Sequence, residues 1–293
     1  MAYDSIKKML KDAQEKNLPL WKVILQEDTA SQNGSEEASM QKMLTLWKTM
    51  QTTTCSYRSE ERSHSGLVGG DSARVSDAAK KGKLIGDAFL NEMIALALQI
   101  SECNACMKRI VAAPTAGSCG VLPAVLIPLA KKENLPDTVM IQALYIAAGF
   151  GEVIAQRASI AGASGGCQAE IGTASAMAAA ALVWLKGGSA EQCAHACAMA
   201  LSNLLGLVCD PVAGLVEVPC VQRNVTGALN AVGAANMALS GVICHIPADE
   251  VIDAMGSIGD QMPTSLRETG KGGLAATPTG QKIAERLTDK TIL

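Results

Sequence analysis

Residues 162–185 read GASGGCQAEIGTASAMAAAALVWL, a glycine-rich turn with one cysteine followed by a run of alanine and aliphatic residues. Alanine is the best helix former, and its small side chain lets neighbouring helices approach closely. Because the run is apolar on every side, it predicts a buried central helix over 172–185. Residues 137–157 have the same character. These two stretches predict a mainly α fold around a core of small side chains.

The composition of the whole chain agrees with such a core. Of the 293 residues, 48% are hydrophobic and 3% are aromatic, so Ala, Leu, Ile, Val and Met must fill the interior. No stretch alternates apolar and polar residues for long, as a half-buried strand would. We therefore expect a single compact helical catalytic domain over 59–293, rich in small-residue helices. A short helical region over 1–58 precedes it, with residues 27–39 as a polar connector inside that region.

Charge and targeting signals narrow the class of protein. The chain has 25 basic and 28 acidic residues and no basic block, which argues against a nucleic-acid partner. Its N-terminus lacks the apolar core of a signal peptide, and its apolar stretches are short or interrupted, so buried helices are favoured over membrane spans. Ten cysteines without a secretory signal are typical of a reducing compartment. We expect a cytoplasmic protein.

Three cysteines stand in irregular, glycine- and proline-rich sequence. Cys167 follows two glycines, and Cys209 and Cys220 bracket CDPVAGLVEVPC. Three thiolates that meet at one point can hold three irons of a [4Fe–4S] cube and leave the fourth iron open as a Lewis acid. The spacing matches none of the compact ferredoxin motifs, so the flanking residues have to support the hypothesis.

Two loops set glycines beside hydroxyl side chains: SHSGLVGGDSARV over 63–75 and APTAGSCG over 113–120. Backbone N–H groups exposed in such loops can hold a carboxylate, although ordinary turns before helices use the same residues. Thr115 and Ser118 suit either a substrate carboxylate or a helix cap. His64 is a candidate base on its residue type alone.

The remaining cysteines and polar residues have simpler interpretations. Cys103 and Cys106 form a C-x2-C on a predicted helix with no second pair, so we interpret them as core residues. Cys193 and Cys197 recur one turn apart on another helix, which also favours a buried face. Behind Cys220, Arg223 either presents a bidentate fork to a carboxylate or lies at the surface beside a helix cap.

Four longer motifs together resemble the α chain of the iron–sulfur-dependent L-serine dehydratases. They are SGGCQAEIGTASAMAAAA, LGLVCDPVAGLVEVPCVQRN, AAPTAGSCGVLPAV and RETGKGGLAATPTG, and the resemblance runs over 63–280. It implies a lyase that dehydrates and deaminates L-serine to pyruvate and ammonia, a reaction of amino-acid catabolism and gluconeogenesis. It also implies a [4Fe–4S] cluster held by Cys167, Cys209 and Cys220, with no pyridoxal phosphate.

The resemblance further implies a substrate site and a partner. The residues that match the family's loops or follow its last cysteine are Ser63, Gly66, Gly69, Gly70, Asp71, Thr115, Gly117, Ser118, Arg223 and Asn224. In this family a Ser-Ser-Ser-His-Thr segment belongs to the β portion, and this chain has none. We therefore expect a heteromer in which a β chain supplies the histidine, and the base within this chain stays unidentified.

Three alternatives stay open at this point. A pyridoxal-phosphate dehydratase would need a lysine in a recognisable pocket motif, and Lys271 is the only lysine among glycines. A related cluster lyase acting on another β-substituted amino acid, such as cysteine, would use the same three thiols. A non-catalytic helical subunit would use them as core residues, so that Cys→Ser changes would be mild.

Overall fold

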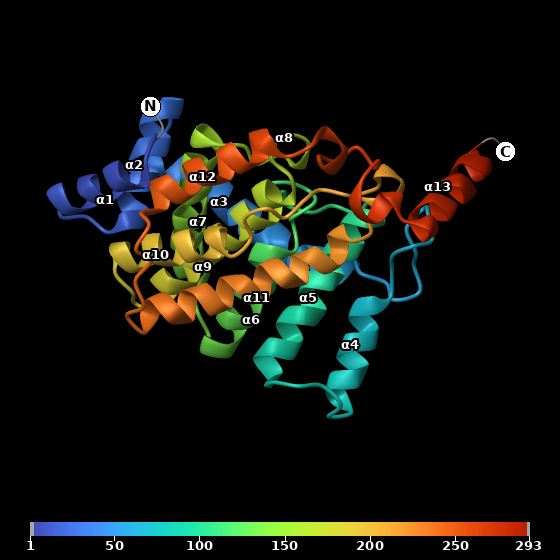
Figure 1. Ribbon diagram of the computed structural model, residues 1–293. Coiled ribbons are helices and arrows are strands. Elements are labelled where there is room, and N and C mark those ends of the chain that lie inside the picture. Colours follow the sequence, from blue (N-terminus) through green and yellow to red (C-terminus); the bar gives the residue numbers. More distant parts are fainter. Residues whose placement is uncertain (1–2, 292–293) are drawn as a thin grey trace.

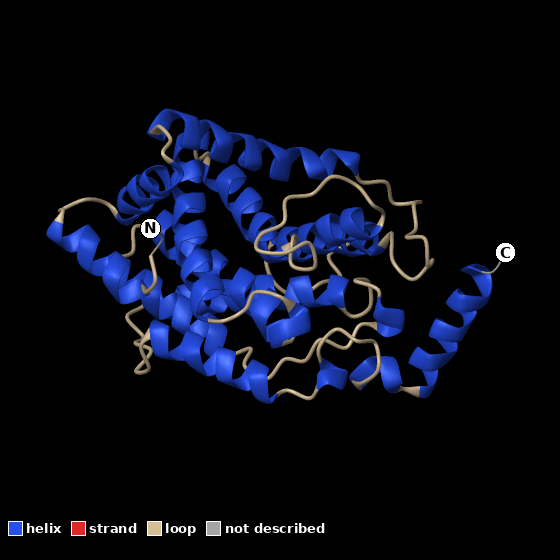
Figure 2. Cartoon of the chain, turned by 90° about the horizontal axis from the view of Figure 1, so that it is seen from above, coloured by secondary structure: helices blue, strands red, loops and turns tan. Residues whose placement is uncertain are grey.

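The computed structural model describes residues 3–291, and its regular elements are all helices (Figures 1 and 2). The mainly α fold predicted from the sequence is confirmed. In chain order the α-helices are α1 (Ile6–Glu15), α2 (Leu20–Gln32), α3 (Glu36–Thr53), α4 (Asp71–Lys80), α5 (Ala88–Ala105), α6 (Val121–Glu133), α7 (Asp137–Arg157), α8 (Gly162–Gly165), α9 (Thr173–Leu185), α10 (Ala190–Ser202), α11 (Cys220–Leu239), α12 (Ala248–Gln261) and α13 (Pro278–Thr291). Shorter helical turns are η1 (Thr54–Ser56), η2 (Gln168–Gly172), η3 (Val212–Gly214), η4 (Thr264–Leu266) and η5 (Gly273–Ala276).

Helix α9 is the centre of the fold, with α6, α7, α10 and α11 packed around it (Figure 1). Every residue from Thr173 to Val183 is buried, as expected for a helix that is apolar on all sides. Small residues bring the axes close together. A Cβ on Gly151 of α7 would lie 2.7 Å from the sulfur of Met177, so a larger residue would require the methionine side chain to shift.

The N-terminal helices share this core. Residues of α1, α2 and α3 belong to the same buried cluster as α9, and Trp47 of α3 donates its indole N–H to Asp137 Oδ1 at the start of α7, at 2.9 Å. The expected division at residue 58 stays a prediction. The polar connector predicted over 27–39 is wrong, because α2 continues to Gln32 and α3 begins at Glu36.

That connector is short because two end signals stand close together. Asn33 takes a left-handed conformation that ends α2, and Ser35 caps α3 by accepting the amide of Ala38 at 3.2 Å. Two glutamates follow in the first turn of α3, where the helix dipole favours negative charge. Polar composition alone suggests a loop here, whereas the capping residues mark a break between two helices.

The predicted boundaries of the central helices agree closely with the structure. Helix α7 spans the predicted 137–157, and Ser189 caps α10 in a capping box with Gln192. Helix α7 is also long and apolar enough to cross a membrane, but 67% of its most apolar window is buried inside the fold. Helix α11 begins at Cys220, so Arg223 and Asn224 are helical residues.

The irregular segments and the peripheral helices occupy one part of the molecule. In Figure 2 the longest loops lie on the half nearer the C-terminus, and α13 extends away from the body there. Helices α4 and α5 form a hairpin that projects from the body in Figure 1. Most of the predicted site residues lie in the irregular segments beside the core, whereas Cys220, Arg223 and Asn224 belong to α11, which packs on α9.

Candidate active site

Three different backbone contexts bring the cysteines to the edge of the core. Cys167 stands between the short helix α8 and η2, a widened π-type turn of the kind often found at functional sites. Cys209 lies in an extended segment, and Cys220 is the first residue of α11. All three thiols are buried. We call Cys167, Cys209 and Cys220 the thiol pocket.

Each of the three thiols has a raised pKa, and charge on the other thiols contributes to the rise for Cys209 and Cys220. Burial raises the pKa of Cys220 to about 12, and negative charge on Cys167 adds to the rise. Burial also raises the pKa of Cys209, with Cys167, Glu170 and Cys220 contributing next. The pKa of Cys167 rises to about 11, because burial outweighs the opposing effect of Arg223. The three thiols thus influence one another's pKa, and their role as ligands stays a prediction.

Glycine keeps space free beside the thiol pocket. A Cβ on Gly162 would lie 2.9 Å from Cys209 Sγ, 3.1 Å from Glu170 Oε2 and 3.2 Å from Glu268 Oε2. Soft thiolate donors around such a space suit an iron–sulfur cluster. Within residues 3–291 no three His, Cys, Asp or Glu side chains are gathered for a single metal ion. A cube binds each thiolate at a separate iron, so the residues present fit a cluster better than a lone ion.

The neighbouring residue, Gln168, holds the turn that carries Cys167 through its side chain and its backbone N–H. Gln168 is buried, and its side-chain oxygen accepts the amide of Gly206 at 2.8 Å. Its side-chain nitrogen donates to the carbonyl of Met255 on α12 at 3.0 Å, and its own amide donates to Leu207 at 2.9 Å. These bonds attach the Cys167 turn to the segment that leads into Cys209.

A buried ion pair lies against the thiol pocket. Arg223 of α11 donates to Asp210 Oδ1 at 2.7 Å and to the carbonyl of Val208 at 2.8 Å. Burial by itself lowers the pKa of Arg223, but negative charge on Cys167 and Asp210 outweighs it and the net pKa is raised. The guanidinium is thus engaged within the protein, next to Cys167. Its role in binding a substrate carboxylate stays a prediction.

The glycine-rich C-terminal segment folds back onto Cys209. The amide of Cys209 donates to Leu266 at 2.8 Å, and its carbonyl accepts the amide of Glu268 at 2.7 Å. Asp210 Oδ2 then accepts the amide of Leu274 at 2.7 Å. Gly273 lies so close to this carboxylate that a Cβ there would be 2.3 Å from Asp210 Oδ2. The conformation around Cys209 therefore depends on residues far along the chain.

The first predicted substrate loop divides into two parts. Ser63 is buried and donates to Glu217 Oε2 at 2.8 Å, while Gly66 forms an open turn with a φ of 77°. Gly69 and Gly70 pack on the preceding backbone, where a Cβ on Gly69 would lie 2.2 Å from the carbonyl oxygen of Glu61. Asp71 begins α4, with its amide bonded to Glu102 at 2.7 Å.

The second predicted substrate loop is fastened to α11. Asn224 is buried and donates to the carbonyl of Gly117 at 2.8 Å, while its side-chain oxygen accepts the amide of Gly120 at 2.9 Å. Thr115 and Ser118 share a hydrogen bond between their hydroxyls at 3.0 Å. A Cβ on Gly117 would lie 3.2 Å from Glu170 Oε2, so this loop borders the thiol pocket.

Two acidic residues of this region lie within the quoted motifs but were not among the predicted site residues. Glu170 is largely buried next to Cys209 and Gly117, and burial raises its pKa despite a hydrogen bond with Thr115. Glu217 is buried among Ser63 and Ser65. Both glutamates stand in otherwise apolar sequence three residues from a proposed cysteine ligand. A charged residue in such a position is a signal that could have found them.

The histidines and the other cysteines lie apart from this arrangement. His64 is exposed, between two buried serines, and His245 is also exposed. His195 is half-buried on α10, between Cys193 and Cys197, which are buried in the helical core as predicted. Cys103 is buried as predicted, whereas Cys106 is half-buried at the end of α5.

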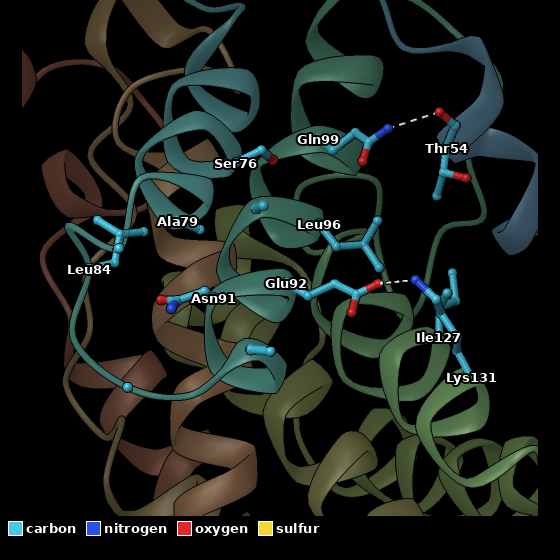
Figure 3. A pocket seen from close by; sticks show the side chains of 14 residues that line it. Thr54, Ser76, Ala79, Leu84, Asn91, Glu92, Leu96, Gln99, Ile127 and Lys131 are labelled. Atoms are coloured by element: carbon cyan, nitrogen blue, oxygen red, sulfur yellow. Dashed lines mark hydrogen bonds and ion pairs between the residues drawn. The ribbon is translucent and has the colours of Figure 1, made fainter.

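The cavity shown in Figure 3 has a volume of about 780 Å³ and lies between α4, α5 and α6, away from the thiol pocket. Its polar groups largely satisfy one another. Gln99 Nε2 donates to the carbonyl of Thr54 at 2.8 Å, and Lys131 pairs with Glu92 at 3.2 Å. None of the sequence-predicted site residues lines it.

In the described residues a helical core carries a buried thiol pocket, and glycine turns lie beside it. These features define a class of helical protein with thiols suited to an iron–sulfur cluster. Comparison with known proteins gives a narrower classification of the chain. The "Serine dehydratase alpha chain" family matches residues 15–275, and the chain belongs to this family. That match includes α2 and α3, so it extends further towards the N-terminus than the motifs alone suggested.

Full-length relatives agree with the family. The probable L-serine dehydratase, alpha chain, of Bacillus subtilis is 45% identical over 285 residues, which cover 97% of this chain and 95% of the relative. The L-serine dehydratase, alpha chain, of Peptoniphilus asaccharolyticus is 43% identical over 270 residues and 92% of each chain. An L-serine dehydratase of Streptomyces coelicolor is 36% identical over 280 residues, which are 91% of this chain but 59% of that longer relative.

Proposed function

We propose that this chain is the α subunit of an L-serine dehydratase and that Cys167, Cys209 and Cys220 hold a [4Fe–4S] cluster. The observation that carries the proposal is the convergence of three buried thiols from three separate segments beside the space kept by Gly162. Family membership supports the reaction, since the aligned relatives are named for L-serine dehydration.

The reaction removes the α-proton and the β-hydroxyl of L-serine as water. The resulting aminoacrylate tautomerises to an imine, and its hydrolysis gives pyruvate and ammonia, so no external oxidant or reductant is needed. When bound, the cluster supplies an open iron as the Lewis acid for the leaving hydroxyl. The protein supplies three thiolate ligands, a buried pocket that excludes bulk water, and the Arg223 guanidinium that offsets negative charge beside Cys167.

We further propose that the base comes from a β partner. The alpha-chain name of the relatives implies a second chain, and the longer Streptomyces relative has residues outside the aligned part. In this structure His64 and His245 are exposed, and His195 lies on α10 between two core cysteines. A histidine delivered across a subunit interface would complete the site.

The test combines the anaerobically purified chain with its β partner. We expect about four irons and four sulfides per α chain, together with pyruvate formed from L-serine. Absence of iron after anaerobic reconstitution would overturn the cluster. Iron without pyruvate from L-serine, but with pyruvate from L-cysteine, would keep the site and replace the substrate. Full activity of the chain without the partner would contradict the proposed origin of the base.

A further inference from the structure

Glu217 joins the first substrate loop to the segment between Cys209 and Cys220. Its side-chain oxygen Oε2 accepts the hydroxyl of Ser63 at 2.8 Å and also the hydroxyl of Ser65. All three side chains are buried. These bonds connect residues more than 150 positions apart in the sequence. A buried carboxylate here is therefore held by two neutral hydroxyls rather than by a lysine or arginine.

The same hydroxyls also organise the loop itself. Ser65 Oγ accepts the amide of Leu67 at 3.0 Å, and Ser63 Oγ accepts the amide of Val68 at 3.3 Å. The amide of Ser63 donates to the carbonyl of Val68 at 2.9 Å, which closes the turn. Each hydroxyl thus donates to Glu217 and accepts from the loop backbone. Loss of the carboxylate would free both hydroxyls to rotate and would weaken their hold on the loop amides.

The backbone around Glu217 contacts both the proposed cluster segment and the second substrate loop. The carbonyl of Glu217 accepts the amide of Val221 at 3.0 Å, in the first turn of the helix that begins with Cys220. The neighbouring Val216 lies beside Gly117, where a Cβ would be 3.3 Å from its Cγ1 atom. One short stretch of chain therefore touches both loops that the sequence predicts to bind substrate, and it leads directly into a predicted ligand.

We propose that Glu217 is a positioning residue for the dehydration. Its carboxylate sets the place of the loop of residues 63–68 relative to Cys220, so that the loop's backbone donors face the substrate. This inference rests on the proposed function. Neither Ser63 nor Ser65 needs to touch the substrate in this arrangement, because their hydroxyl protons are directed to Glu217. The bound carboxylate of L-serine would instead meet loop backbone groups.

The kinetic test compares Glu217→Gln with Glu60→Gln in the complete α–β enzyme. Glu60 is exposed and bonded to Ser59, so it is a matched control outside the site. We expect Glu217→Gln to lower kcat/KM for L-serine about tenfold, mainly through KM, as when a charge-assisted hydrogen bond becomes a neutral one. Iron and sulfide per chain should equal those of the wild type. Unchanged kcat/KM, or iron lost in proportion to activity, would overturn the positioning role.

A double variant tests whether Glu217 and Ser65 act together. If they form one unit, Glu217→Gln combined with Ser65→Ala should lower kcat/KM no further than the larger single effect. If the two effects multiply, the proposed connection is refuted. Ser65→Ala also provides a second route to the result should Glu217→Gln fold poorly.

Hydrogen exchange gives a readout that does not depend on activity. In Glu217→Gln the amides of Leu67 and Val68 should exchange about tenfold faster than in the wild type, since their acceptor hydroxyls lose the carboxylate that orients them. Equal exchange would refute the inference even in an active enzyme. Faster exchange in a chain that makes no pyruvate even as wild type would preserve the connection but refute the proposed function.

Discussion

Cys193 and Cys197 of α10 and the thiol pocket are all buried cysteines with different surroundings. The two on α10 lie one helical turn apart in a regular helix, and burial raises the pKa of Cys193 to about 12. The thiol pocket is just as buried, yet it stands where a π-type turn, an extended segment and a helix start meet. Burial and thiol pKa therefore do not separate structural cysteines from candidate ligands.

Buried charge and irregular backbone do separate the two groups. The thiol pocket lies next to the Arg223–Asp210 ion pair and the Glu170 carboxylate, which are costly to bury without a purpose. Cys193 stands between Gln192 and Ala194 and Cys197 between two alanines, and both belong to the hydrophobic core. The comparison indicates that buried polar groups surround the thiol pocket, whereas small apolar side chains surround the cysteines of α10.

The largest effect should follow from changing a thiol of the pocket. Cys167→Ser, Cys209→Ser or Cys220→Ser should each lower pyruvate formation at least about 1,000-fold, because loss of the Lewis acid removes several kcal/mol of stabilisation. Iron per chain should fall while the helical circular dichroism is retained. Cys197→Ser is the matched control and should keep its iron. Equal iron loss in Cys197→Ser would contradict the distinction between the thiol pocket and the cysteines of α10.

The next largest effect should come from the largely buried ion pair beside the thiol pocket. Asp210→Ala leaves Arg223 without its carboxylate in a buried site, which should lower the free energy of unfolding by about 3 kcal/mol. Asp77→Ala removes an exposed pairing with Lys80 at 3.6 Å and should change it by less than about 0.5 kcal/mol. Urea unfolding measures both. Similar values for the two variants would show that the charge is not structurally important.

The smallest effect concerns the cysteines on α10 and appears only at alkaline pH. Burial raises the pKa of Cys197 above its ordinary 9.0, so the folded state keeps a proton that the unfolded chain releases. The protonated Cys197 thiol stabilises the folded state fully below pH 9.0. This stabilisation is lost as the pH rises through the folded-state pKa of the thiol. Between these values the free energy of unfolding should fall by up to about 1.4 kcal/mol per pH unit for this thiol.

Cys197→Ala should therefore flatten the decline of stability with rising pH. Unfolding curves under reducing conditions at about pH 7.0, 8.5 and 10 would measure the slope for the wild type and the variant. Cys55→Ala is the control, because Cys55 is exposed. Parallel declines in the wild type and Cys197→Ala would contradict the role given to burial.

The regular helices were predictable because their signals are local. The spacing of apolar residues over 137–157, the alanine run over 172–185 and the cap at Ser189 each act within a few residues of the chain. The prediction of a connector over 27–39 was wrong, because polar composition does not distinguish a loop from exposed helix ends. Most of these polar residues lie on exposed helix ends. Capping at Ser35, rather than polarity, decided where those helices stop and start.

The candidate site was predictable in its cysteines and loops but not in its connections. Cys167, Cys209 and Cys220 stand in distinctive glycine- and proline-rich sequence, which is enough to indicate them as candidate ligands. The position of Glu170 and Glu217, three residues from a proposed ligand, marks them in the sequence, but it does not show which residues they contact. The role of each glutamate depends on a partner from a distant segment of the chain, such as Ser63 for Glu217.

The sequence by itself determined the helical class, the central position of the alanine-rich helix, the family and the three candidate ligands. These depend on local propensity, side-chain size and motif, which are carried by consecutive residues. The tertiary structure alone decided that Arg223 is bound to Asp210, that the C-terminal segment fixes Cys209, and that Glu217 holds the first substrate loop. Such contacts join residues remote in the chain, and only the packing of the whole helical core brings them within hydrogen-bonding distance.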